Sequence, residues 1–166
     1  PNRQAFLVVA LLARIMPDEL RPVILQQLID NLTITRNGHL GTGMIGTSFM
    51  LDLLSREGRN DLVSMMMAKT TYPSWGFLSE TRGVTTWPET WTGWGSQIIL
   101  VTGSPGAWFH EGLVGLRPDP SAPGFKKFTV KPGVVREAEW ARASHQSPYG
   151  IIAVEWRKEN SGLKLD

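Results

Sequence analysis

The chain has 166 residues, enough for one domain or parts of two, and its 42% hydrophobic and 19% charged residues are typical of folded globular proteins. The net charge of +2 comes from scattered basic residues without a basic stripe, and no apolar run reaches membrane-spanning length, so we expect neither nucleic-acid nor membrane partners. The absence of cysteine excludes disulfides and thiolate chemistry and leaves the compartment undecided. Because the chain opens at Pro1 and closes in an interrupted strand pattern, we expect an internal or C-terminal piece of a longer protein.

Four helices are predicted in the first part of the chain, over residues 4–16, 19–32 and 44–56 and from residue 60 or 61 onward. The first helix is apolar on nearly every side, which indicates burial all round. Asp18 is the expected N-cap of the second helix. Residues 37–43 form a glycine-rich loop that leads into the third helix, which Gly58 ends.

Residues 72–94, the tryptophan loop, hold four of the seven tryptophans around one carboxylate, Glu89. Proline and glycine interrupt this stretch and no helical or strand period is present, so we expect an irregular loop. Loops of this length are often functional, and large aromatic side chains on a loop either pack or bind a ligand. We therefore predict a sugar-binding pocket lined by tryptophans, in which the Glu89 carboxylate takes part in the chemistry.

The rest of the chain changes from helical to strand-like patterns. Residues 96–116 are apolar around a Gly-Ser-Pro-Gly interruption, which predicts a kinked helix or two short ones. Helices that alternate with short turns and long glycine-rich loops are typical of stacked antiparallel helix pairs. Prolines mark residues 118–124 as a linker, and period-two patterns beyond it predict antiparallel strands. The expected domains are a helical unit over 1–117 and an incomplete β unit over 125–166.

An ordered set of motifs covers nearly the whole chain. It comprises Gly-His-Leu-Gly-Thr-Gly at 38–43, Tyr-Pro-Ser-Trp-Gly-Phe at 72–77, Thr-Thr-Trp-Pro-Glu-Thr-Trp at 85–91, Trp-Phe at 108–109, Gly-Leu-Arg-Pro-Asp at 115–119 and Pro-Gly-Phe at 123–125. The set resembles the bacterial α-L-rhamnosidase family, glycoside hydrolase family 78. The resemblance implies a mainly α fold, the later helices of an (α/α)6 barrel followed by the start of a C-terminal antiparallel β-sandwich. It also implies inverting hydrolysis of terminal α-L-rhamnosides, with a rhamnose-containing oligosaccharide or glycoside as substrate.

Inverting hydrolysis requires two carboxyl groups about 6.5–9.5 Å apart, one to protonate the leaving oxygen and one to deprotonate water. The resemblance puts the general base on Glu89 and the general acid in the missing N-terminal part of the parent chain. From the residues alone, Glu89 either serves as this base or only hydrogen-bonds loop backbone. No metal and no cofactor are expected, since the three histidines lack metal-ligand spacing.

Trp87 and Trp91 bracket Glu89 and are the strongest candidates for sugar contacts. Trp75 is either a sugar contact or an anchor of the loop in the core. His39 either borders the pocket or makes a hydrogen bond at a helix start. Thr42 either holds a sugar hydroxyl or caps the third helix.

The remaining tryptophans within periodic elements, Trp108, Trp140 and Trp156, are expected in the core. The resemblance also implies a sugar-contacting histidine, which family members commonly carry in a Ser-x-Asn-His segment about ten residues after the second tryptophan of the base motif. Ile99 stands at that position here, so we expect a changed substrate specificity or a loss of activity. An isolated half-barrel exposes an inner face, so we expect this piece to be inactive alone and to form homo-oligomers or be poorly stable. Two alternatives stay open: a helical-barrel glycosidase acting on uronic sugars, and a non-catalytic carbohydrate-binding or scaffold fragment.

Overall fold

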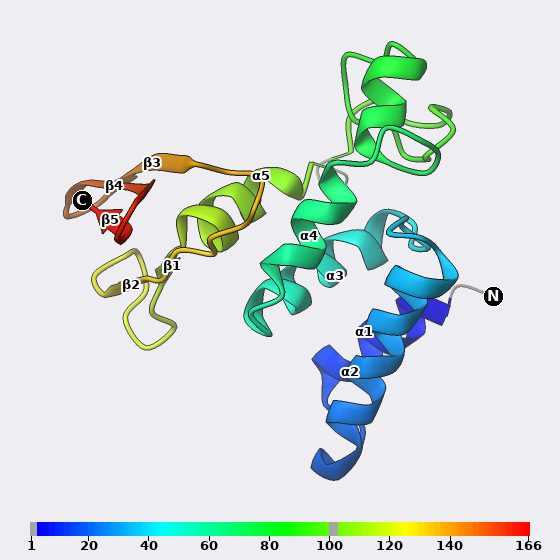
Figure 1. Ribbon diagram of the computed structural model, residues 1–166, viewed down its shortest axis with the longest axis horizontal. Coiled ribbons are helices and arrows are strands. Elements are labelled where there is room, and N and C mark those ends of the chain that lie inside the picture. Colours follow the sequence, from blue (N-terminus) through cyan, green and yellow to red (C-terminus); the bar gives the residue numbers. More distant parts are fainter. Residues whose placement is uncertain (1–2, 100–102) are drawn as a thin grey trace. The chain divides into compact units, whose positions relative to one another are not determined.

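The computed structural model describes residues 3–99 and 103–166, which form two compact units, Pro1–Pro105 and Gly106–Asp166 (Figure 1). The first unit is helical and the second is built mainly from antiparallel strands. Each unit is described by itself. Within the described residues, no helix is both long and apolar enough to cross a membrane.

The first unit is built from successive helices, drawn in blue to green in Figure 1. They are α1 (Arg3–Ala13), η1 (Asp18–Leu20), α2 (Arg21–Asp30), η2 (Asn31–Thr35), α3 (Met44–Arg56), α4 (Asn60–Met67) and η3 (Phe77–Thr81). α1 packs on both α2 and α3, and α3 packs on α4. The helices predicted over residues 44–56 and from residue 60 are confirmed by α3 and α4. Gly58 ends α3 with a φ of 71°, and its N–H donates to the Ser55 carbonyl at 3.1 Å.

The core of this unit is aliphatic. Its side chains with exposures of 2% or less include Val8, Leu11, Leu28, Leu32, Leu40, Met50, Leu53, Leu54, Val63 and Leu78. The prediction that α1 is buried all round is wrong, because Phe6 is 72% and Val9 46% exposed. The described residues cover α1 with only two long helices, which leaves one face without a partner.

The entry to α2 also differs from the prediction. Asp18 begins the short 3₁₀ turn η1 instead of capping an α-helix, and its side chain makes no cap hydrogen bond. The apolar side chains of Leu20 and Val23, at this entry, are 48% and 54% exposed. The chain therefore enters α2 through a continuous helical turn. Because the N–H groups of Leu20 and Arg21 already bond to the carbonyls of Pro17 and Asp18, a side-chain cap at residue 18 has no free N–H group to satisfy.

The tryptophan loop contains one regular element that the pattern did not predict, the π-helical turn η3. Ser74 stabilises its start, because the Ser74 hydroxyl oxygen accepts a hydrogen bond from the Phe77 N–H at 3.0 Å. Leu78 is its buried residue, and Gly83 follows with a φ of 64°. Five residues with one buried side chain are too few for a periodicity signal.

The predicted helical stretch over residues 96–116 begins later than expected. Residues 96–99 are not helical, residues 100–102 lie outside the described part, and the helical segments are α5 (Pro105–Trp108) and η4 (Phe109–Val114). η4 ends at Gly115, whose φ is 84°. A Cβ on Gly115 would collide with the Lys131 carbonyl, so the close approach of the two backbones requires glycine.

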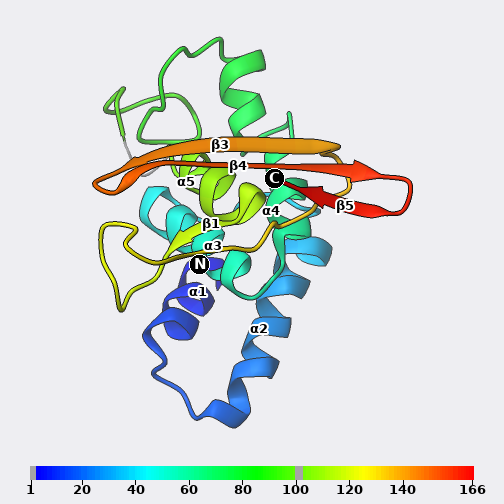
Figure 2. The ribbon, with the colours of Figure 1, turned by 90° about the vertical axis from the view of Figure 1, so that its left-hand side faces the viewer.

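The second unit holds two small antiparallel sheets. β1 (Leu116–Pro118) pairs with β2 (Phe128–Val130), and β3 (Trp140–Ser147), β4 (Gly150–Glu159) and β5 (Gly162–Leu165) form a sheet in that order. Figure 2 shows the long β3–β4 hairpin, whose register pairs Ser147 with Gly150, and β5 beside β4. The strands predicted from the period-two patterns are confirmed. Pro118 belongs to the ladder opposite Phe128, and the division into 1–117, 118–124 and 125–166 stays a prediction.

Trp156 anchors this unit. It is fully buried, and its indole N–H donates to the Leu113 carbonyl at 2.9 Å, which ties β4 to η4. Trp108 is also buried, at 5% exposure, as predicted. The prediction that Trp140 is core is wrong, because Trp140 begins the edge strand β3 and is 49% exposed, with the Arg142 guanidinium 5.8 Å from its ring centroid.

Candidate functional site

A pocket of about 400 Å³ in the first unit brings together the glycine-rich loop and the tryptophan loop. Its lining residues are Arg36, Leu40, Gly41, Thr42, Gly43, Tyr72, Pro73, Glu89, Thr90, Trp91 and Thr92. Three predicted site residues therefore meet here, namely Thr42, Glu89 and Trp91. Trp75, Trp87 and His39 do not line this pocket.

Glu89 is half-buried, and a short backbone pairing fixes the segment that carries it. The Glu89 N–H donates to the Ser96 carbonyl at 2.8 Å, and the Ile99 N–H donates to the Trp87 carbonyl at 3.0 Å. The Glu89 side chain joins the same pairing, because its Oε2 accepts a hydrogen bond from the Ser96 N–H at 3.2 Å. One carboxylate oxygen is thus held by loop backbone.

The other carboxylate oxygen, Oε1, has no hydrogen-bond donor among residues 3–99 and 103–166, and no described cation pairs with the carboxylate. The two interpretations of Glu89 are therefore not exclusive. The backbone bond orients the group through Oε2, and Oε1 keeps its lone pairs for a ligand or a water molecule.

Trp91 connects the two loops. Its indole N–H donates to the Thr42 carbonyl at 2.8 Å, and its ring packs edge-to-face on Trp75 with centroids 5.1 Å apart and planes at 87°. Trp75 is only 4% exposed, which places it behind Trp91 as a support in the core. Edge-to-face pairs of this kind contribute about 0.5–1.5 kcal/mol beyond the area that they bury.

Thr42 is 3% exposed, and its hydroxyl lies 2.8 Å from the hydroxyl of Thr47. Because the Thr47 hydroxyl donates to the Gly43 carbonyl at 2.9 Å, the Thr42 hydroxyl is the donor within the pair. Thr42 does not cap α3, since the N-cap is Gly43 and no side chain bonds there. The Thr42 hydroxyl proton is thus already used inside the protein.

His39 is held on both sides. Its Nδ1 lies 3.0 Å from the Arg36 carbonyl and its Nε2 lies 2.7 Å from the Thr71 hydroxyl. A carbonyl only accepts, so Nδ1 carries a proton, and in the neutral ring Nε2 accepts from Thr71. His39 therefore ties the glycine-rich loop to the residue that precedes Tyr72.

The two remaining tryptophans of this loop are more open. Trp87 is 38% and Trp94 72% exposed. Trp87 takes part in the backbone pairing that positions Glu89, because its carbonyl accepts the hydrogen bond from the Ile99 N–H. A sugar contact by Trp87 stays a prediction.

Arg36 and Tyr72 line the pocket but were not predicted. The Arg36 guanidinium lies against Gly41, where any Cβ would collide with it, and Nη1 donates to the Leu40 carbonyl at 3.4 Å. Arg36 was missed because it is one of several scattered basic residues. The available sequence signal was the glycine at position 41, where the absence of a Cβ leaves room for the Arg36 side chain. Tyr72 is 54% exposed and packs edge-to-face on Phe77.

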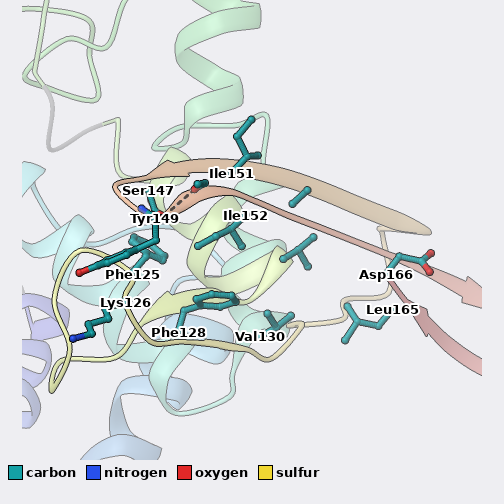
Figure 3. Close-up of a pocket in the computed structure, with 13 residues that line it drawn as sticks. Phe125, Lys126, Phe128, Val130, Ser147, Tyr149, Ile151, Ile152, Leu165 and Asp166 are labelled. Carbon is teal, nitrogen blue, oxygen red and sulfur yellow. Dashed lines mark hydrogen bonds between the residues drawn. The ribbon is translucent and has the colours of Figure 1, made fainter.

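A second pocket, of about 670 Å³, lies in the second unit between β2 and the β3–β4 hairpin (Figure 3). Its lining is mostly apolar and consists of Phe125, Lys126, Phe128, Val130, Ser147, Tyr149, Gly150, Ile151, Ile152, Ala153, Val154, Leu165 and Asp166. Figure 3 shows Phe128 and Val130 on one side and Ile152 on the other. Among the described residues of this lining, only Asp166 has a carboxylate side chain, so they do not supply the pair of carboxyl groups that glycoside hydrolysis requires.

Comparison with known proteins defines the class of protein. Residues 2–113 match the bacterial alpha-L-rhamnosidase 6 hairpin glycosidase domain, and residues 115–166 match the bacterial alpha-L-rhamnosidase C-terminal domain. The chain therefore belongs to the bacterial α-L-rhamnosidase family.

The chain is similar to an alpha-L-rhamnosidase of Alteromonas sp. (strain LOR), at 33% identity over 156 residues that cover 86% of this chain and 16% of that protein. Among solved structures, it resembles Streptomyces avermitilis alpha-L-rhamnosidase complexed with L-rhamnose, with a TM-score of 0.86 and 27% identity over 98% of this chain and 16% of that one. It also resembles alpha-L-rhamnosidase from Dictyoglumus thermophilum, with a TM-score of 0.86 and 28% identity over 95% of this chain and 18% of that one. The chain thus spans about one sixth of the length of these relatives.

Proposed function

We propose that this chain is the C-terminal part of an inverting glycoside hydrolase that cleaves terminal α-L-rhamnosides, with Glu89 as the general base. The observation that carries the proposal is the placement of the Glu89 carboxylate in the pocket beside Trp91, with Oε2 held by the Ser96 N–H and Oε1 without a described donor. Family membership supports the substrate class, since the relatives are named alpha-L-rhamnosidases. A rhamnose-containing oligosaccharide or glycoside is the proposed substrate.

In the proposed reaction, a water molecule attacks the anomeric carbon on the face opposite the leaving group. Glu89 accepts one proton of this water while the water oxygen forms a bond to the anomeric carbon. The glycosidic bond breaks at the same time, and a general acid protonates the leaving oxygen. The acid comes from the N-terminal part of the parent chain. Glu57 pairs with Arg21, and Glu80 lies on the exposed side of η3, so neither is proposed as the acid.

The tryptophans have separate proposed roles. Trp91 presents its ring in the pocket, where an indole face packs on the apolar side of a sugar and favours the positive charge of the transition state. Trp87 is proposed as a second sugar contact, on the segment that also carries Glu89. Trp75 supports Trp91 from the core.

The proposed fold is the later part of an (α/α)6 barrel followed by the start of a β-sandwich. The exposed apolar side chains on α1 and α3 support this, since a complete barrel has further helices to cover them; they are Phe6, Val9, Ile45 and Phe49. A homo-oligomer of the isolated chain would cover the same side chains. Such a chain is proposed to lack hydrolase activity, because it holds the base without the acid.

The test uses the parent enzyme and an aryl α-L-rhamnoside. Glu89→Gln is expected to lower kcat by about 10²- to 10⁴-fold, as removal of a general base does. In Glu89→Ala, azide replaces the activated water, attacks the anomeric carbon and expels the aryl oxide, which gives a rhamnosyl azide of inverted configuration. Unchanged turnover in Glu89→Gln, or robust turnover by the isolated 166-residue chain, contradicts the proposal.

A second candidate follows from Arg36, which lines the pocket together with Glu89. A guanidinium beside the base favours an acidic sugar, as in a helical-barrel glycosidase that acts on uronic sugars. Parallel assays with an aryl rhamnoside and an aryl uronide distinguish the two, and Arg36→Gln abolishes uronide turnover selectively if the second candidate is correct. A non-catalytic carbohydrate-binding fragment would instead bind rhamnose equally well after Glu89→Gln and belong to an inactive parent.

A further inference from the structure

We propose that Gly95 is a positioning residue for the carboxylate of Glu89, an inference that rests on the proposed role of Glu89 as general base. Gly95 precedes Ser96, whose N–H donates to Glu89 Oε2 and whose carbonyl accepts from the Glu89 N–H. The carboxylate is therefore bound on the residue next to Gly95. The absence of a side chain at position 95 leaves the space that this carboxylate occupies.

Hydrogen bonds within the turn from Thr90 to Ser96 define this geometry. The Thr90 hydroxyl donates to the Trp94 carbonyl at 2.8 Å and accepts from the Trp94 N–H at 3.1 Å, and the Gly93 N–H donates to the Thr90 carbonyl at 3.0 Å. The Gln97 amide donates to the Gly95 carbonyl at 2.8 Å. These bonds hold residue 95 in place against residue 89.

Two properties of position 95 call for glycine. Its φ is 93°, in the region that residues with a Cβ rarely adopt. A Cβ built on Gly95 would lie 2.8 Å from Glu89 Oε2, 3.0 Å from Glu89 Cβ and 3.4 Å from the carboxylate carbon. A side chain at position 95 would therefore push the carboxylate away from the Ser96 N–H.

Displacement of a reacting group by about 1 Å costs about a hundredfold in rate, because the base and the attacking water lose their alignment. The binding of the sugar depends on other contacts and is not expected to change in parallel. Gly95 thus acts through Glu89, and its effect falls on kcat more than on KM.

Gly93 offers a matched control on the same turn. Its φ of 88° is close to that of Gly95, so an alanine meets the same backbone penalty at both positions. A Cβ on Gly93 would meet only Arg82 Nε at 3.7 Å and Val84 Cγ1 at 3.8 Å, which are ordinary contacts. Gly93→Ala therefore reproduces the strain of Gly95→Ala without touching Glu89.

The experiment measures kcat and KM of the parent enzyme with an aryl α-L-rhamnoside, with rates normalised to the folded fraction measured by circular dichroism. Gly95→Ala is expected to lower kcat by about a hundredfold with little change in KM, whereas Gly93→Ala keeps kcat within a few-fold. Equal losses in the two variants would overturn the inference and show that strain in the turn is the cause.

A double-mutant cycle isolates the contact with Glu89. In the Glu89→Ala background, with azide supplying the nucleophile, a second change Gly95→Ala is expected to leave the azide-rescued rate unaltered, because no carboxylate remains to be displaced. A further loss of that rate contradicts the inference. In these measurements, the proposed function itself fails if Glu89→Ala leaves ordinary hydrolysis intact, an outcome that is distinct from the failure of the Gly95 role.

Discussion

The indole N–H of Trp91 donates to the carbonyl of Thr42 at 2.8 Å and so joins two loops whose residues are 49 positions apart in the sequence. This bond and the ring contact with Trp75 hold one wall of the pocket that Glu89 borders. The pocket is therefore assembled by tertiary contacts of the tryptophan loop.

Replacement Trp91→Phe tests the bond between the two loops. Phenylalanine keeps an aromatic ring beside Trp75 but cannot donate a hydrogen bond to Thr42. The free energy of unfolding is expected to fall by about 0.5–1.5 kcal/mol, the net contribution of one such bond, with a further loss in kcat/KM. Urea denaturation and steady-state kinetics of the parent enzyme measure the two effects. Trp94→Phe is the control, because Trp94 is 72% exposed, and a comparable loss there would contradict the role given to Trp91.

Replacement Ile99→His tests the position at which the family resemblance leads us to expect a sugar-contacting histidine. The backbone of residue 99 is fixed by its N–H bond to the Trp87 carbonyl, so the new imidazole is held on the segment that pairs with residues 87–89. We expect kcat/KM for an aryl α-L-rhamnoside to rise by about tenfold, the equivalent of one hydrogen bond to the sugar. Ile98→His is the control, since the Ile98 side chain is 79% exposed. An increase in both variants would show an effect without positional specificity.

Replacement Gly115→Ala tests the packing of the second unit. The left-handed φ of 84° alone costs about 1–2 kcal/mol for alanine, and the Cβ would also collide with the Lys131 carbonyl. We expect a loss of more than about 3 kcal/mol in the stability of this unit, measured by hydrogen exchange on β3 and β4. Gly124→Ala has a similar φ of 72°, and its Cβ would meet only Pro148 at 3.9 Å, so the backbone term is expected alone. Equal losses in the two variants would argue against the collision.

The pair of Arg59 and Asp61 predicts a pH dependence of stability at the start of α4. Two hydrogen bonds from the Arg59 guanidinium, at 2.9 and 2.8 Å, hold the pKa of Asp61 below its ordinary value. A lowered folded-state pKa contributes stability above the unfolded pKa of about 3.9, and this contribution is lost as the pH falls through the folded-state value.

Because the Asp61 side chain is 61% exposed, its contribution is expected to be only about 0.2–1 kcal/mol. Asp61→Asn is expected to lower the free energy of unfolding by this amount at pH 7 and to have a smaller effect at about pH 2, because protonation of Asp61 weakens its pairing with Arg59 as the pH falls. Urea denaturation at the two pH values measures the difference. The same loss at both values would assign the effect to packing.

The sequence allowed the elements with strong local signals to be predicted. α3 and α4 have apolar spacing over several turns and clear ends, and β3 and β4 alternate on either side of a Ser-Pro-Tyr-Gly turn. The family resemblance was confirmed, since residues 2–113 and 115–166 match its two domains. Within the pocket, Glu89, Trp91 and Thr42 were singled out in advance and the structure brings them together.

Other features depend on contacts that a local pattern does not contain. The sequence does not tell which faces of α1 find partners, so the exposure of Phe6 and Val9 was missed. Trp140 was expected in the core because it alternates with polar neighbours, but its place on an edge strand leaves it half-exposed. The hydroxyl of Thr42 stands near a helix start and yet bonds to Thr47, a pairing that arises only once α3 has formed.

The link between Ile99 and Trp87 runs through main-chain atoms, so it does not depend on which side chain residue 99 carries. Under the role proposed for Glu89, we expect substitutions at position 99 to change sugar selectivity while the carboxylate two residues after Trp87 keeps its geometry. In evolutionary terms, the proposed chemistry and the proposed selectivity of this segment are separable: one short stretch of backbone holds the Glu89 carboxylate, and the side chain of residue 99, on the facing segment, can vary.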